Sequence, residues 1–253
     1  MSWVAQGRAV VRLCYFNGII PLWRSPLLIA AVFLTPFSFL FFLKVIAPAA
    51  AFPFGVVGGI LFTVLFSGNG MLNDCAYLRL ERQLQQVFVA SPVRSFSYVL
   101  GMALSELAFT LPALALFLGI LAAILPISWG GFLLLLGVVL LTWLMATTLG
   151  FLISTMFRQL REIWPIGTLT FSTLAILPPI FYPANVIPAQ YQWVAFLAPT
   201  TFAAQLADRA AGLPSGALSP GFLGDPIVNL AGLLGATVLF ALAAAYLARW
   251  REP

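Results

Sequence analysis

Long apolar runs separated by short polar segments make up most of the chain. The hydrocarbon core of a bilayer is about 30 Å thick, and a helix that crosses it needs about 20 apolar residues. Backbone groups in lipid must bond within the chain, and runs without two-residue alternation indicate helices rather than a barrel. The pattern therefore predicts six membrane-spanning helices, over residues 27–46, 53–73, 96–124, 129–156, 165–182 and 227–248.

Residues 3–23 precede the first predicted span and combine apolar side chains with the basic residues Arg8 and Arg12. A cleaved signal peptide is one interpretation of such a segment. However, Arg12 interrupts the apolar run, and no small-residue cleavage site follows it. We favour a helix that lies in the membrane interface.

Residues 183–226 separate the fifth and sixth predicted spans. They contain two short helical stretches, 188–197 and 200–211, which Pro199 divides, and each is too short to cross a bilayer. Read as one broken span, the two stretches would give seven crossings and place the basic C-terminal residues outside the cell. We favour two short re-entrant helices on the outer side, followed by an irregular Gly-, Pro- and Ser-rich loop over 212–226.

Composition strengthens the membrane interpretation and removes several functions. Hydrophobic residues are 62% of the chain and charged residues only 8%, against about 45–50% and about 25% in soluble proteins. The chain has no histidine, which excludes zinc sites and catalytic triads built on that residue. Cys14 and Cys75 form no CxxC motif. We expect an all-α polytopic membrane protein with a single domain over residues 1–253.

The basic residues predict the orientation of the chain, because cytoplasmic loops carry an excess of Lys and Arg. With six spans, Lys44 and Arg209 lie on one side of the membrane. The other ten basic residues then share the opposite side, which would be cytoplasmic and would hold both termini of this cell-membrane protein. The net charge of +5 is thus a signal of topology rather than of nucleic-acid binding. The ten residues are Arg8, Arg12, Arg24, Arg79, Arg82, Arg94, Arg158, Arg161, Arg249 and Arg251.

The cytoplasmic loop over residues 76–95 is polar, yet Leu80, Leu84, Val87 and Phe88 recur in it at helical spacing. At 100° per residue, these four side chains lie within an arc of about 100°. A short amphipathic helix of this kind either lies on the bilayer surface or docks into a groove on a soluble partner. Composition alone favours neither alternative.

Polar residues inside the predicted spans are the next candidates for function. Glu106 lies in the third span, where a charge is costly to insert. It either faces a translocation path or a polar partner, or lies close to the cytoplasmic interface. Ser67, Asn69, Asn73 and Asp74 form a polar patch at the end of the second span, where we favour hydrogen bonds between helices over substrate contact.

Four charged residues outside the spans have simple interpretations. In the turn after the fourth span, Arg158 and Glu162 have the i, i+4 spacing of a helical ion pair, which we favour over contact with a partner protein. On the outer side, Asp208 and Arg209 are expected to form a solvated face.

Two stretches of the chain carry a resemblance to a known family. The first is Glu81-Arg82 followed by Ala90-Ser91-Pro92-Val93. The second stretch comprises Phe181, Tyr182, Pro183, Pro188, Trp193 and Pro199. In order and spacing the two stretches resemble the membrane subunits of ATP-binding-cassette exporters of the second type, which include drug-efflux permeases and polysaccharide or lipo-oligosaccharide export permeases.

The resemblance implies that a separate ATPase subunit binds ATP and Mg²⁺. The chain itself has no GxxxxGK[ST] phosphate loop, and we expect no catalytic residue, cofactor or metal in it. Residues 80–88 would then be the helix that couples the permease to the ATPase. The coupling residues would be Leu80, Glu81, Arg82, Leu84, Val87 and Phe88.

The resemblance also implies a second permease in the complex, either another copy of this chain or a homologous partner. Symmetry makes a homodimer the default arrangement. The expected function is ATP-driven export of an amphipathic, lipid-linked or drug-like substrate. The alternatives are a membrane scaffold, an integral membrane enzyme and a passive channel.

Overall fold

The computed structural model describes residues 3–46, 48–82, 93–214, 218 and 221–247, and its longer elements in this part of the chain are all helices. The expected all-α class is therefore confirmed. A π-helical turn, Tyr15–Ile19, joins the first two α-helices. The α-helices are α1 Trp3–Cys14, α2 Ile20–Arg24, α3 Pro26–Ile46, α4 Phe52–Leu80, α6 Ser95–Ile124, α7 Trp129–Met156, α8 Leu160–Ile176, α9 Gln192–Ala195, α10 Pro199–Ala210 and α11 Pro226–Leu247.

Four of the described helices, α4, α6, α7 and α11, are long and apolar enough to cross a membrane. The predicted bounds of the spans over 96–124, 129–156 and 227–248 agree with α6, α7 and α11 to within one residue at each end. In α6 and α7 the apolar run and the helix coincide because non-helical residues flank both ends. The four helices establish a multi-pass membrane protein.

Two of the predicted spans have wrong boundaries. The second span was expected to end at residue 73, but α4 continues without a break to Leu80. Cys75 and Ala76 in this extension are buried in the bundle. The polar residues of the extension are therefore held by contacts with protein, which a pattern of apolar residues does not reveal.

The fifth predicted span, over residues 165–182, is displaced in the structure. Helix α8 begins at Leu160 and ends at Ile176. Glu162 lies in its first turn, where a negative charge is favourable because the helix dipole is positive at that end. Pro178 and Pro179 end the helix, because proline has no backbone N–H to continue its hydrogen bonds.

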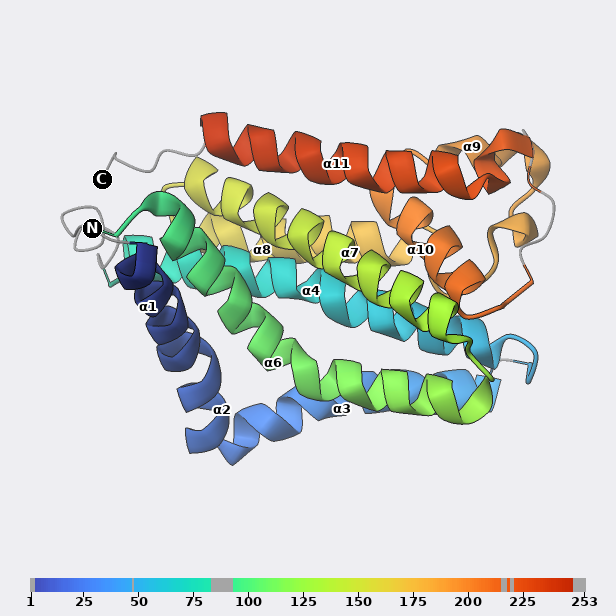
Figure 1. The fold of residues 1–253 in the computed structure, drawn as a ribbon, viewed down its shortest axis with the longest axis horizontal. Coiled ribbons are helices and arrows are strands. Elements are labelled where there is room, and N and C mark those ends of the chain that lie inside the picture. Colours follow the sequence, from blue (N-terminus) through green and yellow to red (C-terminus); the bar gives the residue numbers. More distant parts are fainter. Residues whose placement is uncertain (1–2, 47, 83–92, 215–217, 219–220, 248–253) are drawn as a thin grey trace.

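The long helices run between two ends of an elongated bundle (Figure 1). One end holds the start of α1 and the last turns of α4, α7 and α11, and we call it the terminal end. The other, the distal end, holds the start of α4, the turn between α6 and α7, and the C-terminal end of α10. Both α1 and α11 thus have their outer termini at the same end, as expected for an even number of crossings.

Helix α4 lies at the centre of the bundle and packs against α7, α6 and α8. Its closest neighbour is α7, which runs parallel to it from the distal to the terminal end (Figure 1). A Cβ atom at Gly150 would meet the backbone of Gly68, and one at Gly68 would meet the carbonyl group of Ala146. The two backbones therefore touch, which only glycine allows at this crossing.

The N-terminal helical segment packs along the first half of α6. The backbone N–H of Arg94 donates to the side chain of Gln6 at 3.1 Å, and the Arg94 guanidinium lies 5.1 Å from the centre of the Trp3 ring. Farther along, Ser105 Oγ donates to the Leu13 carbonyl at 3.3 Å. Residues 3–24 are helical as predicted, and their position in the membrane interface remains a prediction.

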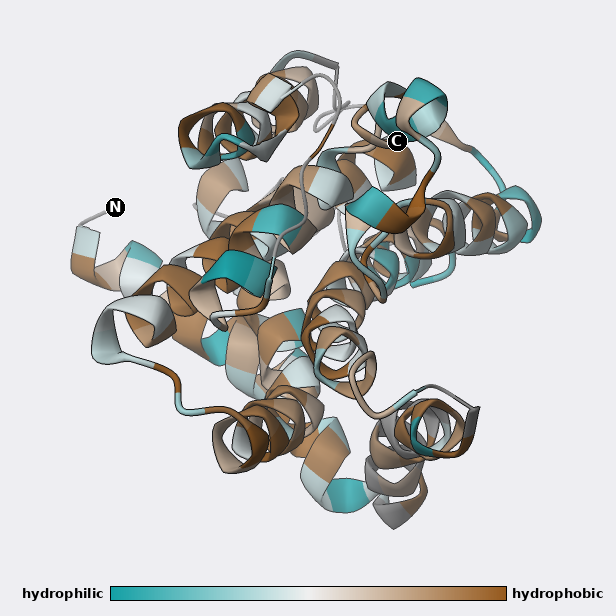
Figure 2. Ribbon diagram, turned by 90° about the vertical axis from the view of Figure 1, so that its right-hand side faces the viewer, coloured by the Kyte–Doolittle hydropathy of each residue, from teal (hydrophilic) through white to brown (hydrophobic). Residues whose placement is uncertain are grey.

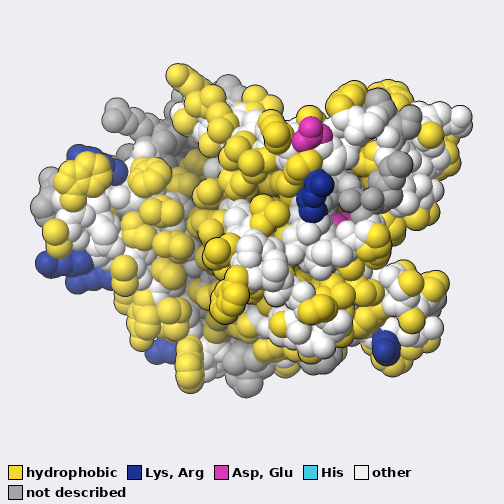
Figure 3. Space-filling model, turned by 45° about the vertical axis from the view of Figure 1, so that its right-hand side comes forward, with side chains coloured by type: hydrophobic (Ala, Val, Ile, Leu, Met, Phe, Trp, Pro, Cys, Tyr) yellow, Lys and Arg dark blue, Asp and Glu magenta, His cyan; other side chains and the backbone are white. Residues whose placement is uncertain are grey.

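The outer surface of the bundle is largely apolar. Hydrophobic residues predominate along the helices seen from the distal end (Figure 2), and hydrophobic side chains cover most of the face in Figure 3. On that face Lys and Arg gather mainly at the terminal end. Phe41, Phe42, Leu133 and Leu239 are examples of large side chains that are mostly exposed, as is expected of helices that face lipid.

Candidate functional site

The first candidate site lies where α4 ends and the predicted coupling segment begins. Leu80 is the last residue of α4, and the next two residues, Glu81 and Arg82, are exposed. Arg82 folds back on the helix, where its Nε donates to the hydroxyl of Tyr77 at 2.9 Å. Glu81 and Arg82 are therefore accessible at the terminal end of the bundle.

The other predicted coupling residues, Leu84, Val87 and Phe88, lie outside the described residues. The apolar stripe that they would form with Leu80 stays a prediction from the sequence. The structure supplies the position from which that stripe would start, because α4 ends at Leu80, which is partly buried against the core at the terminal end.

Arg79 is the residue at this end whose role the sequence did not reveal. Its Nη1 donates to the carbonyl oxygen of Thr155 at 3.1 Å, and its Nη2 donates to that of Ser154 at 2.5 Å and to that of Phe157. These carbonyls belong to the last turn and the C-cap of α7, where backbone acceptors have no partner within their own helix. One guanidinium thus joins the C-terminal ends of α4 and α7.

The turn between α7 and α8 lies directly after the acceptors of Arg79. Arg158, Arg161 and Glu162 are all exposed there. The expected helical ion pair between Arg158 and Glu162 is not formed in the described structure, because α8 begins only at Leu160 and Gln159 has extended backbone. The exposed charges of this turn remain accessible to a partner.

Glu106, the candidate for a translocation path, is buried in α6 with 6% of its surface exposed. Its carboxyl group hydrogen-bonds to that of Asp74 and packs on Gly70, both on α4. A hydrogen bond between two carboxyl groups requires a proton on one of them. Glu106 thus lies deep between α6 and α4, and its part in a translocation path stays a prediction.

The residues of the polar patch at the end of the predicted second span differ in their hydrogen bonds. Asp74 makes the contact between helices that we favoured for the patch. Ser67 Oγ donates instead to the Val64 carbonyl of its own helix at 2.6 Å. The side-chain oxygens of Asn69 and Asn73 are buried without a hydrogen bond. Among the described residues, the expected hydrogen bond between helices is therefore found for Asp74 and not for the side-chain oxygens of Ser67, Asn69 and Asn73.

The second stretch of the family resemblance folds into short turns around its prolines. Pro183 and Pro188 each precede a single 3₁₀ turn, and Pro199 is the first residue of α10. Phe181 packs against Phe62 of α4, with ring centres 6.0 Å apart, whereas Tyr182 and Trp193 are exposed. Threonine side chains hold the start of α10. The hydroxyl of Thr200 donates to the Leu174 carbonyl at 2.7 Å, and that of Thr201 donates to the Ala195 carbonyl.

The prediction that Asp208 and Arg209 form a solvated face is wrong for Asp208. Arg209 is exposed, but Asp208 has only 4% of its surface exposed and its Oδ1 has no hydrogen-bond partner. Burial raises the pKa of the Asp208 carboxyl well above its usual range. The burial comes from the packing of α10 against α7 and α11, which are distant in sequence.

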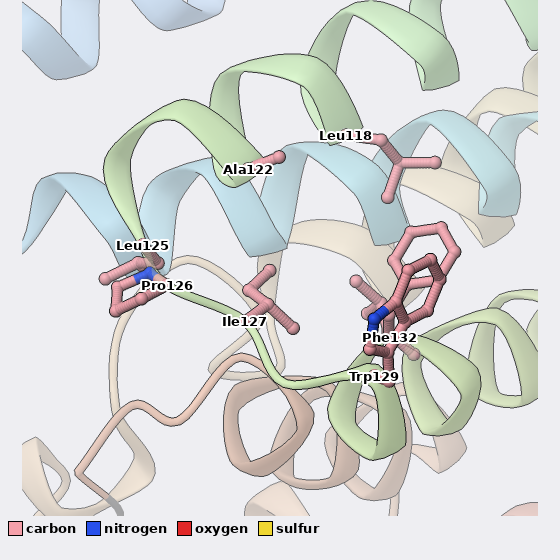
Figure 4. A pocket seen from close by; sticks show the side chains of 8 residues that line it. Leu118, Ala122, Leu125, Pro126, Ile127, Trp129 and Phe132 are labelled. Atoms are coloured by element: carbon pink, nitrogen blue, oxygen red, sulfur yellow. The ribbon is translucent and has the colours of Figure 1, made fainter.

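An apolar cavity of about 350 Å³ lies at the distal end between α6, the turn after it and the first turns of α7 (Figure 4). Leu118 and Ala122 of α6 line one side, and Trp129 and Phe132 of α7 line another, with their rings in an edge-to-face arrangement. A cavity of this volume and lining suits an apolar group better than a polar one.

The architecture and the surface define a multi-pass helical membrane protein whose charges gather mainly at one end. A comparison with family models makes this more specific, because the model described as ABC-2 type transporter matches residues 10–207. The chain belongs to this family and is a transmembrane permease subunit of an ABC transporter. A search of curated proteins gave no match.

Proposed function

We propose that this permease couples ATP hydrolysis on a partner subunit to the export of an amphipathic, lipid-linked or drug-like substrate. The observation that carries the proposal is the family match together with the exposed end of α4, from which residues 80–88 would reach the partner. Binding and closure of the partner ATPase would bias the permease between two conformations that differ in their affinity for it. The chain itself would perform no catalysis, and ATP and Mg²⁺ would bind to the partner.

The proposed arrangement has six crossings and both termini in the cytoplasm. Helix α3, with 21 residues, and α8, with 17 residues, would supply the two crossings besides the four apolar helices. The terminal end would then be cytoplasmic, in agreement with its excess of basic residues. On the outer side, the short helices α9 and α10 would enter and leave the membrane on the same face.

We further propose that two permeases, most simply two copies of this chain, enclose the substrate path. The large exposed apolar side chains leave ample surface for such a contact as well as for lipid. The distal apolar cavity supports a substrate with an apolar portion, because it offers that portion a site away from water.

The test of coupling is substitution in the predicted apolar stripe. We expect Leu84→Asp and Phe88→Asp to leave membrane insertion intact but to abolish co-purification with the ATPase subunit, because a charge would be buried in the contact. Gln86→Asp is the matched control, since at 100° per residue it adds the same charge on the polar face, about 150° from the centre of the stripe. Normal assembly in both stripe variants would contradict the coupling assignment.

A passive channel is separated from a coupled exporter by a second measurement. The purified permease, reconstituted in vesicles without the ATPase, is expected to show no steady flux of amphipathic dyes. Steady flux under these conditions would favour the channel and count against coupling.

A further inference from the structure

We propose that Arg79 is a positioning residue that transmits movement of the coupling segment to the end of α7 and to the turn that follows it. The inference rests on the proposed function, since it assumes that residues 80–88 contact an ATPase. It goes further by assigning a path for the force. Its basis is the set of hydrogen bonds that the Arg79 guanidinium donates to the carbonyls of Ser154, Thr155 and Phe157.

The position of Arg79 in α4 links it directly to the coupling segment. Arg79 is in the last turn of α4, one residue before Leu80, where that segment begins. A displacement of the segment therefore acts on Arg79 through no more than one turn of helix. A helical turn is stiff over this distance, because every residue in it is held by backbone hydrogen bonds.

The acceptors on α7 are equally close to an exposed surface. Phe157 is the C-cap of α7, and the exposed Arg158 follows it. A guanidinium donates several hydrogen bonds in a fixed planar geometry, so it fixes direction as well as distance. Movement of α4 at this end would therefore carry the end of α7 and the start of the turn with it.

Arg79 adds hydrogen bonds between two helix ends that also pack through buried side chains, among them Cys75 and Ala76 of α4 and Ile153 of α7. The backbones of α4 and α7 touch at Gly68 and Gly150, and at 1.5 Å per residue Arg79 lies about 16 Å beyond Gly68 along α4. The two helices are parallel, so their negative C-terminal dipole ends are adjacent. The positive charge of Arg79 offsets the repulsion between these two negative ends.

Hydrogen–deuterium exchange of the permease–ATPase complex in lipid nanodiscs tests the inference. It compares the complex without nucleotide to the complex trapped with ATP, Mg²⁺ and orthovanadate. In the wild type we expect nucleotide to change exchange both in a peptide over residues 81–92 and in a peptide over residues 157–164. In Arg79→Gln the change over 81–92 should persist, and the change over 157–164 should fall by more than half.

Arg12→Gln is the matched control, because it removes an exposed guanidinium from α1, which packs against α6. It should leave both nucleotide-dependent changes intact. Arg79→Lys keeps the charge but not the planar fork, and should give an intermediate response over 157–164. If Arg79→Gln does not yield a folded complex, Arg79→Lys decides the question.

The possible outcomes separate the inference from the proposed function. A response over 157–164 that is as large in Arg79→Gln and Arg79→Lys as in the wild type overturns the role of Arg79. The same holds if exchange near Phe157 rises equally with and without nucleotide, because that pattern describes a structural bond only. No protection of residues 81–92 when the wild-type permease binds the ATPase would instead refute the coupling segment itself.

Discussion

The burial of the Asp208 carboxyl predicts that the stability of the folded protein depends on pH. The carboxyl is buried near the distal end with Oδ1 unbonded, and burial raises its pKa well above the usual range. In the unfolded chain the same carboxyl ionises near its ordinary pKa of about 4. Between these two pKa values the folded state binds more protons than the unfolded state, so stability falls as pH rises.

The magnitude follows from this difference in protonation. One proton contributes at most about 1.4 kcal/mol per pH unit, so the wild type should lose up to about 2.7 kcal/mol between pH 5 and pH 7. Asp208→Asn cannot ionise and should lack this part of the pH dependence. At about 2 to 4 °C per kcal/mol for a chain of this size, the Tm difference between wild type and variant should change by up to about 5 to 10 °C over that range.

Thermal unfolding of the purified protein in detergent measures this change. Cys75 is buried, so its reaction with a thiol-reactive dye reports unfolding, and Cys14→Ser removes the second thiol. Asp225→Asn is the control, because Asp225 is exposed and its Oδ1 accepts from the Ile227 N–H. An Asp208→Asn variant that keeps the wild-type pH dependence, or a control that loses it, would refute the reasoning.

Three further predictions concern packing, the buried carboxyl pair and topology. Gly150→Ala should lower the free energy of unfolding by about 1–3 kcal/mol, because its Cβ would meet the Gly68 backbone. Gly137→Ala has open space at its Cβ and should be neutral or stabilising in the same dye assay, so equal Tm values for the two variants would contradict the close crossing. Glu106→Gln should keep a hydrogen bond to Asp74, but Glu106→Leu should lower the free energy of unfolding by about 1–3 kcal/mol, because it leaves the Asp74 carboxyl without its partner. A Leu variant as stable as the Gln variant would argue against the hydrogen-bonded pair. In a Cys14→Ser, Cys75→Ser background, an impermeant maleimide outside the cell should label Trp129→Cys and not Ser95→Cys; the reverse result would invert the proposed orientation.

The apolar pattern predicts the long helices well, because a helix that crosses lipid must be a continuous apolar run of about 20 residues. Helices α6, α7 and α11 match their predicted runs almost residue for residue. The pattern failed where protein rather than lipid surrounds the helix. The sequence predicts a polar loop from residue 76, yet α4 continues to Leu80, and Arg79 in this extension finds its acceptors on α7.

The site residues were predictable only as far as their contacts are local. Glu81 and Arg82 are exposed as their polar surroundings suggested. The partners of Arg79 and Glu106 and the burial of Asp208 depend on α7, α4 and the packing of α10, which lie far away in sequence. The one signal for Arg79 in the sequence is an arginine at the end of a largely apolar helix. The distribution of basic residues uses it only to predict the orientation of the chain in the membrane.

The terminal end holds exposed charged residues and also Arg79, which is hydrogen-bonded to α7. Their arrangement constrains how a partner acts on the bundle. Glu81 and Arg82 after α4, and Arg158 and Glu162 after α7, are exposed. Arg79 lies just before the first exposed segment and donates to carbonyls at the end of α7, just before the second. A partner that contacts either segment therefore acts on the same pair of helices. Since the α4 and α7 backbones also touch at Gly68 and Gly150, a movement imposed at the terminal end would be carried toward the middle of the bundle by the pair as a unit.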